Sequence, residues 1–139
     1  MIVRTALTAL VVALALLGPP APAGATDVRP IAFARGKSAA TLSGAVVRGT
    51  RDVYSLEVKG GQTAAISVSA TEKNAVFAIF QPGATVTADG DVNGEALPKA
   101  GEEDEARRWT GRLPATGIYL IVVGGTRGNA TYSLTVQVR

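Results

Sequence analysis

Polar and apolar residues alternate along most of this chain after residue 40, and the spacing typical of a helix is nearly absent. From Tyr132 to Val138 every second residue is apolar and each residue between is polar. A period of two is typical of a strand that buries one of its faces. Alternation and short apolar runs predict strands over 41–47, 53–58, 63–69, 75–80 and 107–113, and two more between Leu113 and Val138.

Two Gly-rich connections predict how neighbouring strands are joined. Lys59-Gly60-Gly61-Gln62 is interpreted as a hairpin turn, because adjacent glycines supply the positive φ angles that tight hairpins need. Near the C-terminus, an apolar strand ends at Gly124-Gly125, a short polar loop follows, and the alternating strand comes next. This pattern predicts a second hairpin that closes an antiparallel sheet with one buried face.

The middle of the chain departs from simple alternation. Residues 75–80 are apolar on both faces, which favours a central strand or a strand inside a sandwich. Residues 84–106 carry seven of the eleven acidic residues and few large apolar ones. We predict a long acidic surface loop there, with one short strand at most.

About eight short strands separated by Gly and Pro turns predict an all-β fold, an antiparallel β-sandwich with a jelly-roll-like layout. Trp109, Gly111 and Leu113 alternate with polar residues, so Trp109 is predicted to point inward. The predicted core consists mainly of Tyr54, Leu56, Ile66, Phe77, Ile79, Trp109, Tyr119, Ile121 and Leu134.

The first 25 residues are predicted to be a secretory signal peptide. A positive residue, Arg4, precedes an apolar run that is too short to span a bilayer, and Ala23-Gly24-Ala25 fits a signal peptidase site. No cysteine follows the run, so a lipid anchor at an N-terminal cysteine is excluded. Residues 26–139 then form a single domain that is periplasmic or secreted, with no membrane anchor.

The composition excludes several kinds of chemistry. The chain has neither cysteine nor histidine, so it has no disulfide, no thiolate nucleophile, no Ser-His-Asp triad and no His-ligated metal. The acidic residues lie in one polar stretch where nothing raises one pKa above another, which argues against glycosidase chemistry. We therefore predict that the protein is not an enzyme. Its net charge of +3 is scattered, so nucleic acid is not an expected partner.

The chain resembles two related families of exported β-sandwich. The stretches 52–58, 61–63 and 113–119 resemble the bacterial pre-peptidase C-terminal domain. The whole chain after the signal peptide resembles the periplasmic inhibitor of goose-type lysozyme, from its opening at 32–40 to the final strands. Both resemblances depend mostly on turn glycines and buried strand residues, so they imply a fold more strongly than a function.

The resemblance to the inhibitor also implies a binding site. That family presents a tyrosine after a Lys-Gly turn and two arginines in its last loop. Here the turn is Arg48-Gly49 and the next residue is Thr50; the first loop arginine matches Arg127, and the second falls near Thr131. The implied contact residues are Thr50, Thr126, Arg127 and Asn129, with Arg127 binding a catalytic carboxylate of a lysozyme.

The acidic segment offers an alternative site. Asp89, Asp91 and Asn93, followed by Gly94, copy the first half of a calcium-binding loop, but Ala100 stands where a bidentate glutamate is needed. We favour a solvated acidic loop with no cofactor and keep calcium as an alternative. The leading hypothesis is thus an exported inhibitor of goose-type lysozyme or a divergent relative. The alternative is a pre-peptidase C-terminal-type module that binds calcium, cell-wall glycan or a secreted peptidase.

Overall fold

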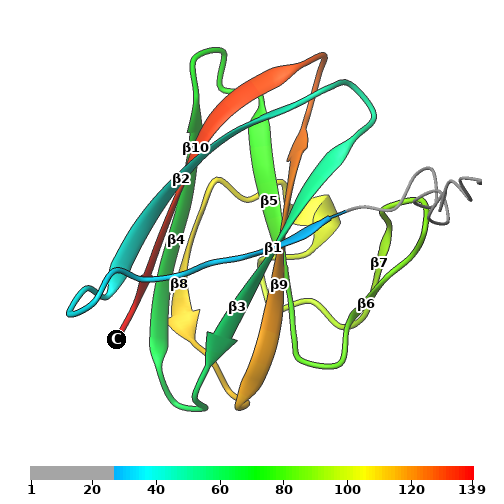
Figure 1. Ribbon diagram of the computed structural model, residues 1–139. Helices are drawn as coiled ribbons and strands as arrows, with labels where there is room; N and C mark the ends of the chain where they lie inside the picture. The colour runs from blue at the N-terminus through cyan, green and yellow to red at the C-terminus, as the bar shows by residue number, and fades with distance from the viewer. Residues whose placement is uncertain (1–26) are drawn as a thin grey trace, which may run out of the picture.

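The computed structural model describes residues 27–139, and the predicted signal peptide lies outside the described residues. Two four-stranded sheets face each other, with strand orders β1-β3-β9-β5 and β2-β10-β4-β8 (Figure 1). Within residues 27–139, no helix is long and apolar enough to cross a membrane. The elements are β1 (Val28–Pro30), β2 (Ala39–Val46), β3 (Arg51–Val58), β4 (Thr63–Ala70), β5 (Ala75–Phe80), β6 (Thr85–Val86), β7 (Val92–Asn93), the 3-10 turn η1 (Glu102–Asp104), β8 (Arg108–Arg112), β9 (Gly117–Gly125) and β10 (Ala130–Val138).

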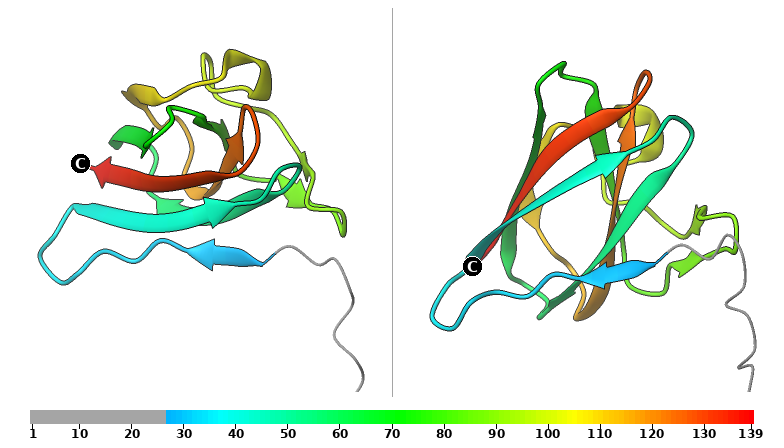
Figure 2. Two further views of the ribbon diagram at one scale, coloured as in Figure 1. Left: turned by 90° about the horizontal axis from the view of Figure 1, so that it is seen from above. Right: turned by 45° about the horizontal axis from the view of Figure 1, so that its top comes forward.

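The predicted antiparallel β-sandwich is confirmed. Figure 2 shows the two layers from two further directions, with connections that run from one layer to the other. In the two main sheets, every described pair of strands is antiparallel except β1 and β3, which run parallel. The structure has ten strands rather than about eight, because β1 and the short β6–β7 pair add to the predicted set.

Both predicted hairpins are wrong, because consecutive strands of the two main sheets always lie in different sheets. β3 pairs with β1 and β9, whereas β4 pairs with β10 and β8. Likewise β9 belongs to the first sheet and β10 to the second. Each connection is therefore an arch that crosses from one layer to the other. This alternation is the jelly-roll-like path that the sequence predicts only in outline.

The turn between β3 and β4 shows why its glycines do not make a hairpin. Gly61 has a φ of 95°, which a glycine adopts without strain. The Gly60 N–H donates to Thr116 Oγ1 at 2.8 Å, and the Gly61 N–H donates to the Leu113 carbonyl at 2.8 Å. The turn is thus held against the β8–β9 connection, and its two strands diverge into opposite sheets.

The core lies between the two sheets, as the alternation predicts. Eight of the nine predicted core residues are 2% exposed or less. The exception is Trp109, which is only partly buried and packs at the margin of the core. Its indole N–H donates to the Pro98 carbonyl at 2.9 Å, so its ring is oriented by a segment that covers the edge of the sandwich. A side chain at Gly111 would place its Cβ 2.7 Å from Cζ2 of Trp109, so the glycine leaves room for the ring.

Residues 81–107, which connect β5 to β8 and are called the excursion below, differ most from the prediction of a solvated loop. The Leu97 N–H donates to the Ile79 carbonyl at 2.9 Å, and the Ile79 N–H donates to the Ala100 carbonyl at 2.9 Å. The excursion thereby takes up hydrogen-bonding groups of β5. Its Val92 also belongs to a second buried cluster that includes Ala78 and Phe80 of β5, which explains why β5 is apolar on both faces.

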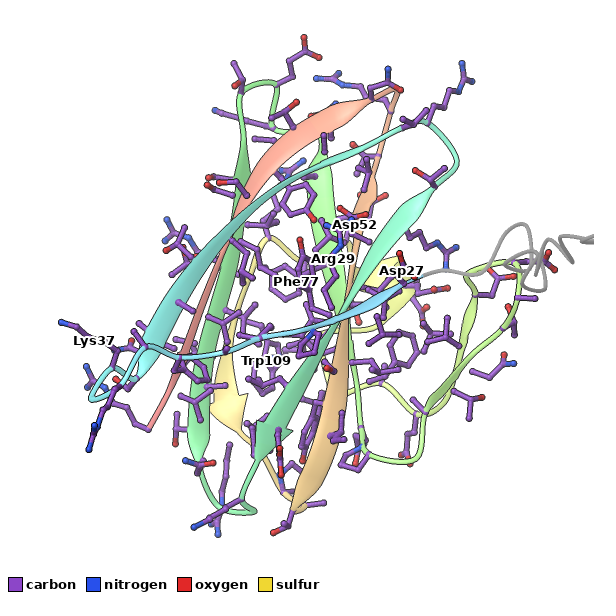
Figure 3. All side chains as sticks on the ribbon, in the orientation of Figure 1. Asp27, Arg29, Lys37, Asp52, Phe77 and Trp109 are labelled. Atoms are coloured by element: carbon purple, nitrogen blue, oxygen red, sulfur yellow. The ribbon has the colours of Figure 1, made fainter. Side chains whose placement is uncertain are left out.

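A polar contact joins the two sheets inside this apolar core. The hydroxyls of Tyr54 on β3 and Tyr132 on β10 lie 2.6 Å apart, and Tyr132 donates to Asp52 Oδ2 at 2.5 Å. The Arg29 guanidinium lies 3.7 Å from the other oxygen of Asp52 (Figure 3). Burial raises the pKa of Tyr132, and its hydrogen bond to Asp52 raises it further. The short strand β1 is thereby tied to the sandwich.

Candidate functional site

Three turns come together at one end of the sandwich, the end that lies at the top of Figure 1. They are residues 47–50 between β2 and β3, 71–74 between β4 and β5, and 126–129 between β9 and β10. We call this region the loop end. It contains all four contact residues that the resemblance implies, and all four are exposed.

Asn74 holds the β9–β10 loop in place through hydrogen bonds to its main chain. It is 2% exposed and is the only buried polar or charged residue of the described chain. Its side-chain N–H groups donate to the carbonyl oxygens of Arg127, at 3.0 Å, and of Asn129, at 2.9 Å. In return, the Thr126 N–H donates to the Asn74 carbonyl at 2.8 Å. Asn74 therefore fixes the backbone of this short loop at three positions, residues 126, 127 and 129.

Arg127 itself lies back against the neighbouring turn. Its Nη2 donates to the Glu72 carbonyl at 3.2 Å. A guanidinium has five N–H donors, so this contact leaves most of them available to a partner. The β9–β10 loop is thus held against the 71–74 turn through both its main chain and the Arg127 side chain.

Asn129 links the β9–β10 loop to the β2–β3 turn. Its side-chain oxygen accepts the main-chain N–H of Arg48 at 2.8 Å. Thr50 does not contact this loop by a hydrogen bond; its hydroxyl donates to the Val47 carbonyl at 2.7 Å and closes its own turn. Thr50 thus has a local structural role, while Asn129 brings Arg48 to the site.

Arg48 is a further candidate residue at the loop end, which the sequence pattern does not single out. Arg48 and Arg127 line the same open hollow of about 350 Å³, together with Gly49, Gly125, Thr126 and Gly128. The two arginines lie 79 positions apart in the sequence, so no local pattern could bring them together. Thr131, where the resemblance places a second arginine, is on β10 and pairs with Ala45.

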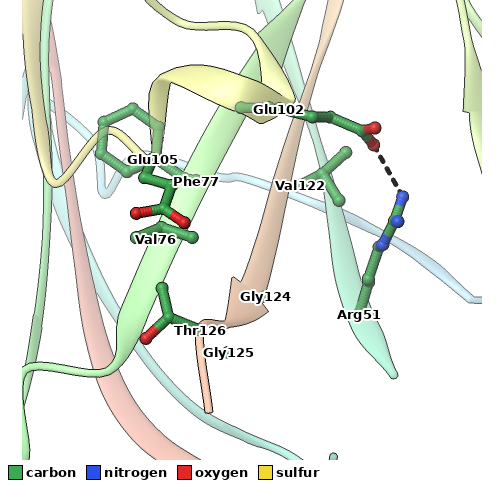
Figure 4. Close-up of a pocket in the computed structure, with 10 residues that line it drawn as sticks. Arg51, Val76, Phe77, Glu102, Glu105, Val122, Gly124, Gly125 and Thr126 are labelled. Atoms are coloured by element: carbon green, nitrogen blue, oxygen red, sulfur yellow. Dashed lines mark hydrogen bonds and ion pairs between the residues drawn. The ribbon is translucent and has the colours of Figure 1, made fainter. Parts of the chain in front are cut away.

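A second hollow, of about 260 Å³, adjoins the first and shares Gly125 and Thr126 with it (Figure 4). Val76, Val122 and Gly124 contribute to its lining. Glu105, Arg51 and Glu102 also line it. Arg51 and Glu102 form an ion pair, in which Nη1 of Arg51 lies 2.7 Å from Oε1 of Glu102. The excursion thus extends the loop end onto the outer face of the first sheet.

The calcium candidates lie at the tip of the excursion. Asp91 Oδ1 is 3.6 Å from Nη1 of Arg51, and the Asp91 N–H donates to Thr87 Oγ1 at 3.1 Å. Asp89 and Asp91 line a shallow hollow together with Arg51 and Thr50. Within residues 27–139, no group of three His, Cys, Asp or Glu side chains is placed to hold a metal ion.

Fold and site together define a class: a small two-layer β-sandwich that presents a rigid, arginine-bearing loop end. In structure, the chain is similar to the periplasmic inhibitor of g-type lysozyme, PliG, from Aeromonas hydrophila. The two are 29% identical, the match covers 83% of this chain and 98% of that chain, and the TM-score is 0.64. PliG from Salmonella Typhimurium is similar at 26% identity, with 81% and 97% covered and a TM-score of 0.57.

The pre-peptidase C-terminal domain of a Bacillus anthracis collagenase shares the fold at 19% identity, with 81% of this chain and 96% of that chain covered and a TM-score of 0.51. Both resemblances inferred from the sequence are therefore confirmed at the level of structure. No protein-family profile and no curated protein sequence matches the chain.

Proposed function

We propose that this chain is an exported, non-enzymatic binding protein that inhibits a goose-type lysozyme through its loop end. The single observation that supports this most is the placement of Arg127 in a loop that Asn74 holds rigid, on a fold similar to that of PliG. A loop that is already ordered loses little conformational entropy on binding. A guanidinium in such a loop suits an acidic cleft, because it binds a carboxylate through two parallel hydrogen bonds.

Export is part of the proposal. The signal peptide is expected to be cleaved after Ala25, which leaves a chain that begins at Thr26. The mass of the exported protein checks this directly. A soluble product that retains Met1 would contradict it.

The inhibitor proposal is tested by adding the purified chain, residues 26–139, to goose-type lysozyme and following the lysis of a peptidoglycan suspension. We expect inhibition, and we expect Arg127→Ala to weaken it by more than about 2 kcal/mol, as loss of a central interface arginine commonly does. The matched control is Arg35→Ala, which removes an exposed arginine of the β1–β2 connection, outside the loop end, and should change inhibition little.

Two outcomes would contradict the proposal. Lysozyme activity that is unaffected by an excess of the wild-type chain would exclude inhibition. Equal losses from Arg127→Ala and Arg35→Ala would indicate diffuse charge attraction without a specific contact at the loop end.

A further inference from the structure

We propose that the outer face of the second sheet is a separate binding surface, which binds a carboxylate-bearing polysaccharide in a shallow groove beside Arg108. This goes beyond the proposed function, because it uses a different face of the molecule and a different class of ligand. The sheet has the strand order β2-β10-β4-β8 (Figure 1). Alternate residues of its strands point into the core, and the residues between them point away from it.

The outward-facing residues of this sheet are mostly small and carry hydroxyl groups. The Ser and Thr residues among them are Thr41, Ser43, Thr63, Ser67, Ser69, Thr110, Thr131, Ser133 and Thr135. Strand pairing aligns Ser43, Ser133 and Ser69 in one row across the sheet, and in the next row the hydroxyl oxygens of Thr41 and Thr135 are 3.4 Å apart. A hydroxyl both donates and accepts hydrogen bonds, as do the hydroxyls of a sugar. We call this surface the hydroxyl face.

The charge of the hydroxyl face is of one sign. Its four strands contain no Asp or Glu, and their charged residues are Arg108 and Arg112, both exposed on β8. Arg139 follows β10, and its main chain pairs with that of the outward-facing Thr63. Among residues 27–139, no ion pair involves any of these three arginines. The hydroxyl face is therefore complementary to an anionic ligand.

A hollow of about 260 Å³ opens in the hydroxyl face. The side chains around it come from three strands: Ala65 and Ser67 on β4, Arg108 and Thr110 on β8, and Thr135 and Gln137 on β10. Because β4 lies between β8 and β10 and contributes the smallest of these side chains, the hollow is a groove along β4. It offers hydroxyl, amide and guanidinium groups together, so it can bind a sugar ring and an acidic group on that ring at once.

The groove is already ordered before a ligand binds. Its floor strand β4 and its wall strand β10 are each paired on both sides, β4 with β10 and β8, and β10 with β2 and β4. Their inward-facing residues Ile66, Leu134 and Val136 are buried in the core. A ligand therefore orders little more than the Arg108 and Gln137 side chains, which keeps the entropic cost of binding low.

The composition of the hydroxyl face favours a sugar chain over other ligands. None of the outward-facing residues on its four strands is aromatic, so none can stack on a nucleobase. The large apolar residues that are exposed in the described chain lie on other elements, so the face lacks the apolar patch that a protein or a membrane would bind. Arg108 and Arg112 are about 13 Å apart along their strand. Such sparse charges suit a polysaccharide with occasional carboxylates, each of which matches the planar fork of a guanidinium.

The first experiment uses three dextrans of equal length as probes: neutral dextran, carboxymethyl-dextran, and dextran sulfate with the same degree of substitution. Each is titrated into the ¹⁵N-labelled chain 26–139 while the amide signals of Ser67, Thr110 and Thr135 are followed by NMR. We expect saturable shifts with carboxymethyl-dextran, weaker binding of dextran sulfate and none of neutral dextran. Equal binding of neutral and carboxymethyl-dextran would overturn the role of the arginines, and tighter binding of dextran sulfate would overturn the assignment of a carboxylate.

Polyglutamate with the same number of carboxylates tests whether the sugar itself is recognised. We expect it to bind more weakly than carboxymethyl-dextran, because it lacks the hydroxyl groups that the Ser and Thr rows contact. Equally tight binding would overturn the polysaccharide assignment and indicate an acidic protein segment.

Variants locate the binding surface. Arg108→Ala and Thr135→Glu should each weaken carboxymethyl-dextran binding about tenfold or more, the first by removing a cation and the second by placing an anion in the groove. The matched control, Arg48→Ala, removes the same charge at the loop end and should bind as the wild type does. Equal losses from Arg108→Ala and Arg48→Ala would overturn the assignment to the hydroxyl face, and so would unchanged binding in Thr135→Glu.

A second experiment separates this inference from the proposed function. Arg108→Ala should inhibit goose-type lysozyme as the wild type does, and Arg127→Ala should bind carboxymethyl-dextran as the wild type does. Loss of both activities in either variant would overturn the separation of the two surfaces. If the wild type inhibits no lysozyme, the proposed function fails, whereas the dextran titrations still decide whether the hydroxyl face binds a polysaccharide.

Discussion

At the scale of single residues, Tyr132 places both an aromatic ring and a hydroxyl group in the core. Its ring is buried in the core and lies across Gly44 on the neighbouring strand β2, where a Cβ would collide with it. Its hydroxyl is satisfied by Tyr54 and Asp52. A buried hydroxyl without partners would destabilise the fold, so these contacts make the position compatible with a core.

The raised pKa of Tyr132 makes a prediction about alkaline stability. Because its pKa in the folded protein is above the unfolded value of about 10, the folded state holds the proton more tightly. The stability that the protonated Tyr132 hydroxyl contributes to the folded state is therefore fully present below pH about 10 and is lost as the pH rises further. Tyr132→Phe should lower the free energy of unfolding at pH 7 by about 1–3 kcal/mol. Above pH 10 the free energy of unfolding of the variant should fall less steeply with pH than that of the wild type. Urea unfolding of both proteins between pH 7 and 11 measures this, and identical slopes would contradict it.

At the scale of elements, the excursion shows how an acidic segment can still be structural. Seven acidic residues face solvent or the loop end, whereas Leu97, Ala100 and Ala106 are buried in the main core. Its backbone pairs with β5 at Phe77, where the N–H donates to the Ala106 carbonyl at 2.9 Å. An uncovered edge strand exposes unpaired backbone groups, so the excursion protects β5.

This role predicts that Leu97 matters for stability, although it lies in a segment whose sequence indicates a surface loop. Leu97 is 3% exposed, so Leu97→Ala should leave a cavity and cost about 2–5 kcal/mol. Glu103→Ala, at an exposed position of the same segment, is the matched control and should change stability by less than about 0.5 kcal/mol. Chemical denaturation of the two variants tests the difference. A loss below about 1 kcal/mol for Leu97→Ala would contradict the structural role of the excursion.

At the scale of the whole molecule, the alternation of strands between layers decides where function is located. Each connection between main-sheet strands spans the thickness of the sandwich, so turns distant in the sequence meet at the same end. The loop end is assembled in this way from three arches, and the tip of the excursion borders it through the contact of Asp91 with Arg51. A basic site and an acidic segment are thereby adjacent.

This arrangement predicts that calcium has little effect on the protein. A cation at Asp89 and Asp91 would lie beside the Arg51 guanidinium, which is 3.6 Å from Asp91, and like charges would weaken its binding. Saturating calcium should therefore shift the melting temperature by less than about 1 °C. Thermal unfolding with calcium, and with magnesium as a control, measures this. A clear calcium-dependent rise that Asp91→Ala abolishes would support the alternative binding module.

The pattern of the sequence is sufficient to predict an all-β protein and most of the buried side chains on its strands. A period of two records the face of a strand directly, so eight of nine predicted core residues are correct without knowledge of any strand partner. The flanking glycines and the resemblance likewise predict an exposed loop at Arg127, and Arg127 is exposed in the loop between β9 and β10.

Which sheet each strand joins, and which loops meet, depends on contacts between distant parts of the chain. The turn at Gly60 and Gly61 is equally compatible with a hairpin and an arch; contacts with residues 113–116, more than 50 positions away, select the arch. The same long-range packing covers β5 with the excursion and brings Asn74 and Arg48 to Arg127. Local periodicity reports burial, whereas strand pairing depends on contacts between distant segments, and these carry no signature in a short window of sequence.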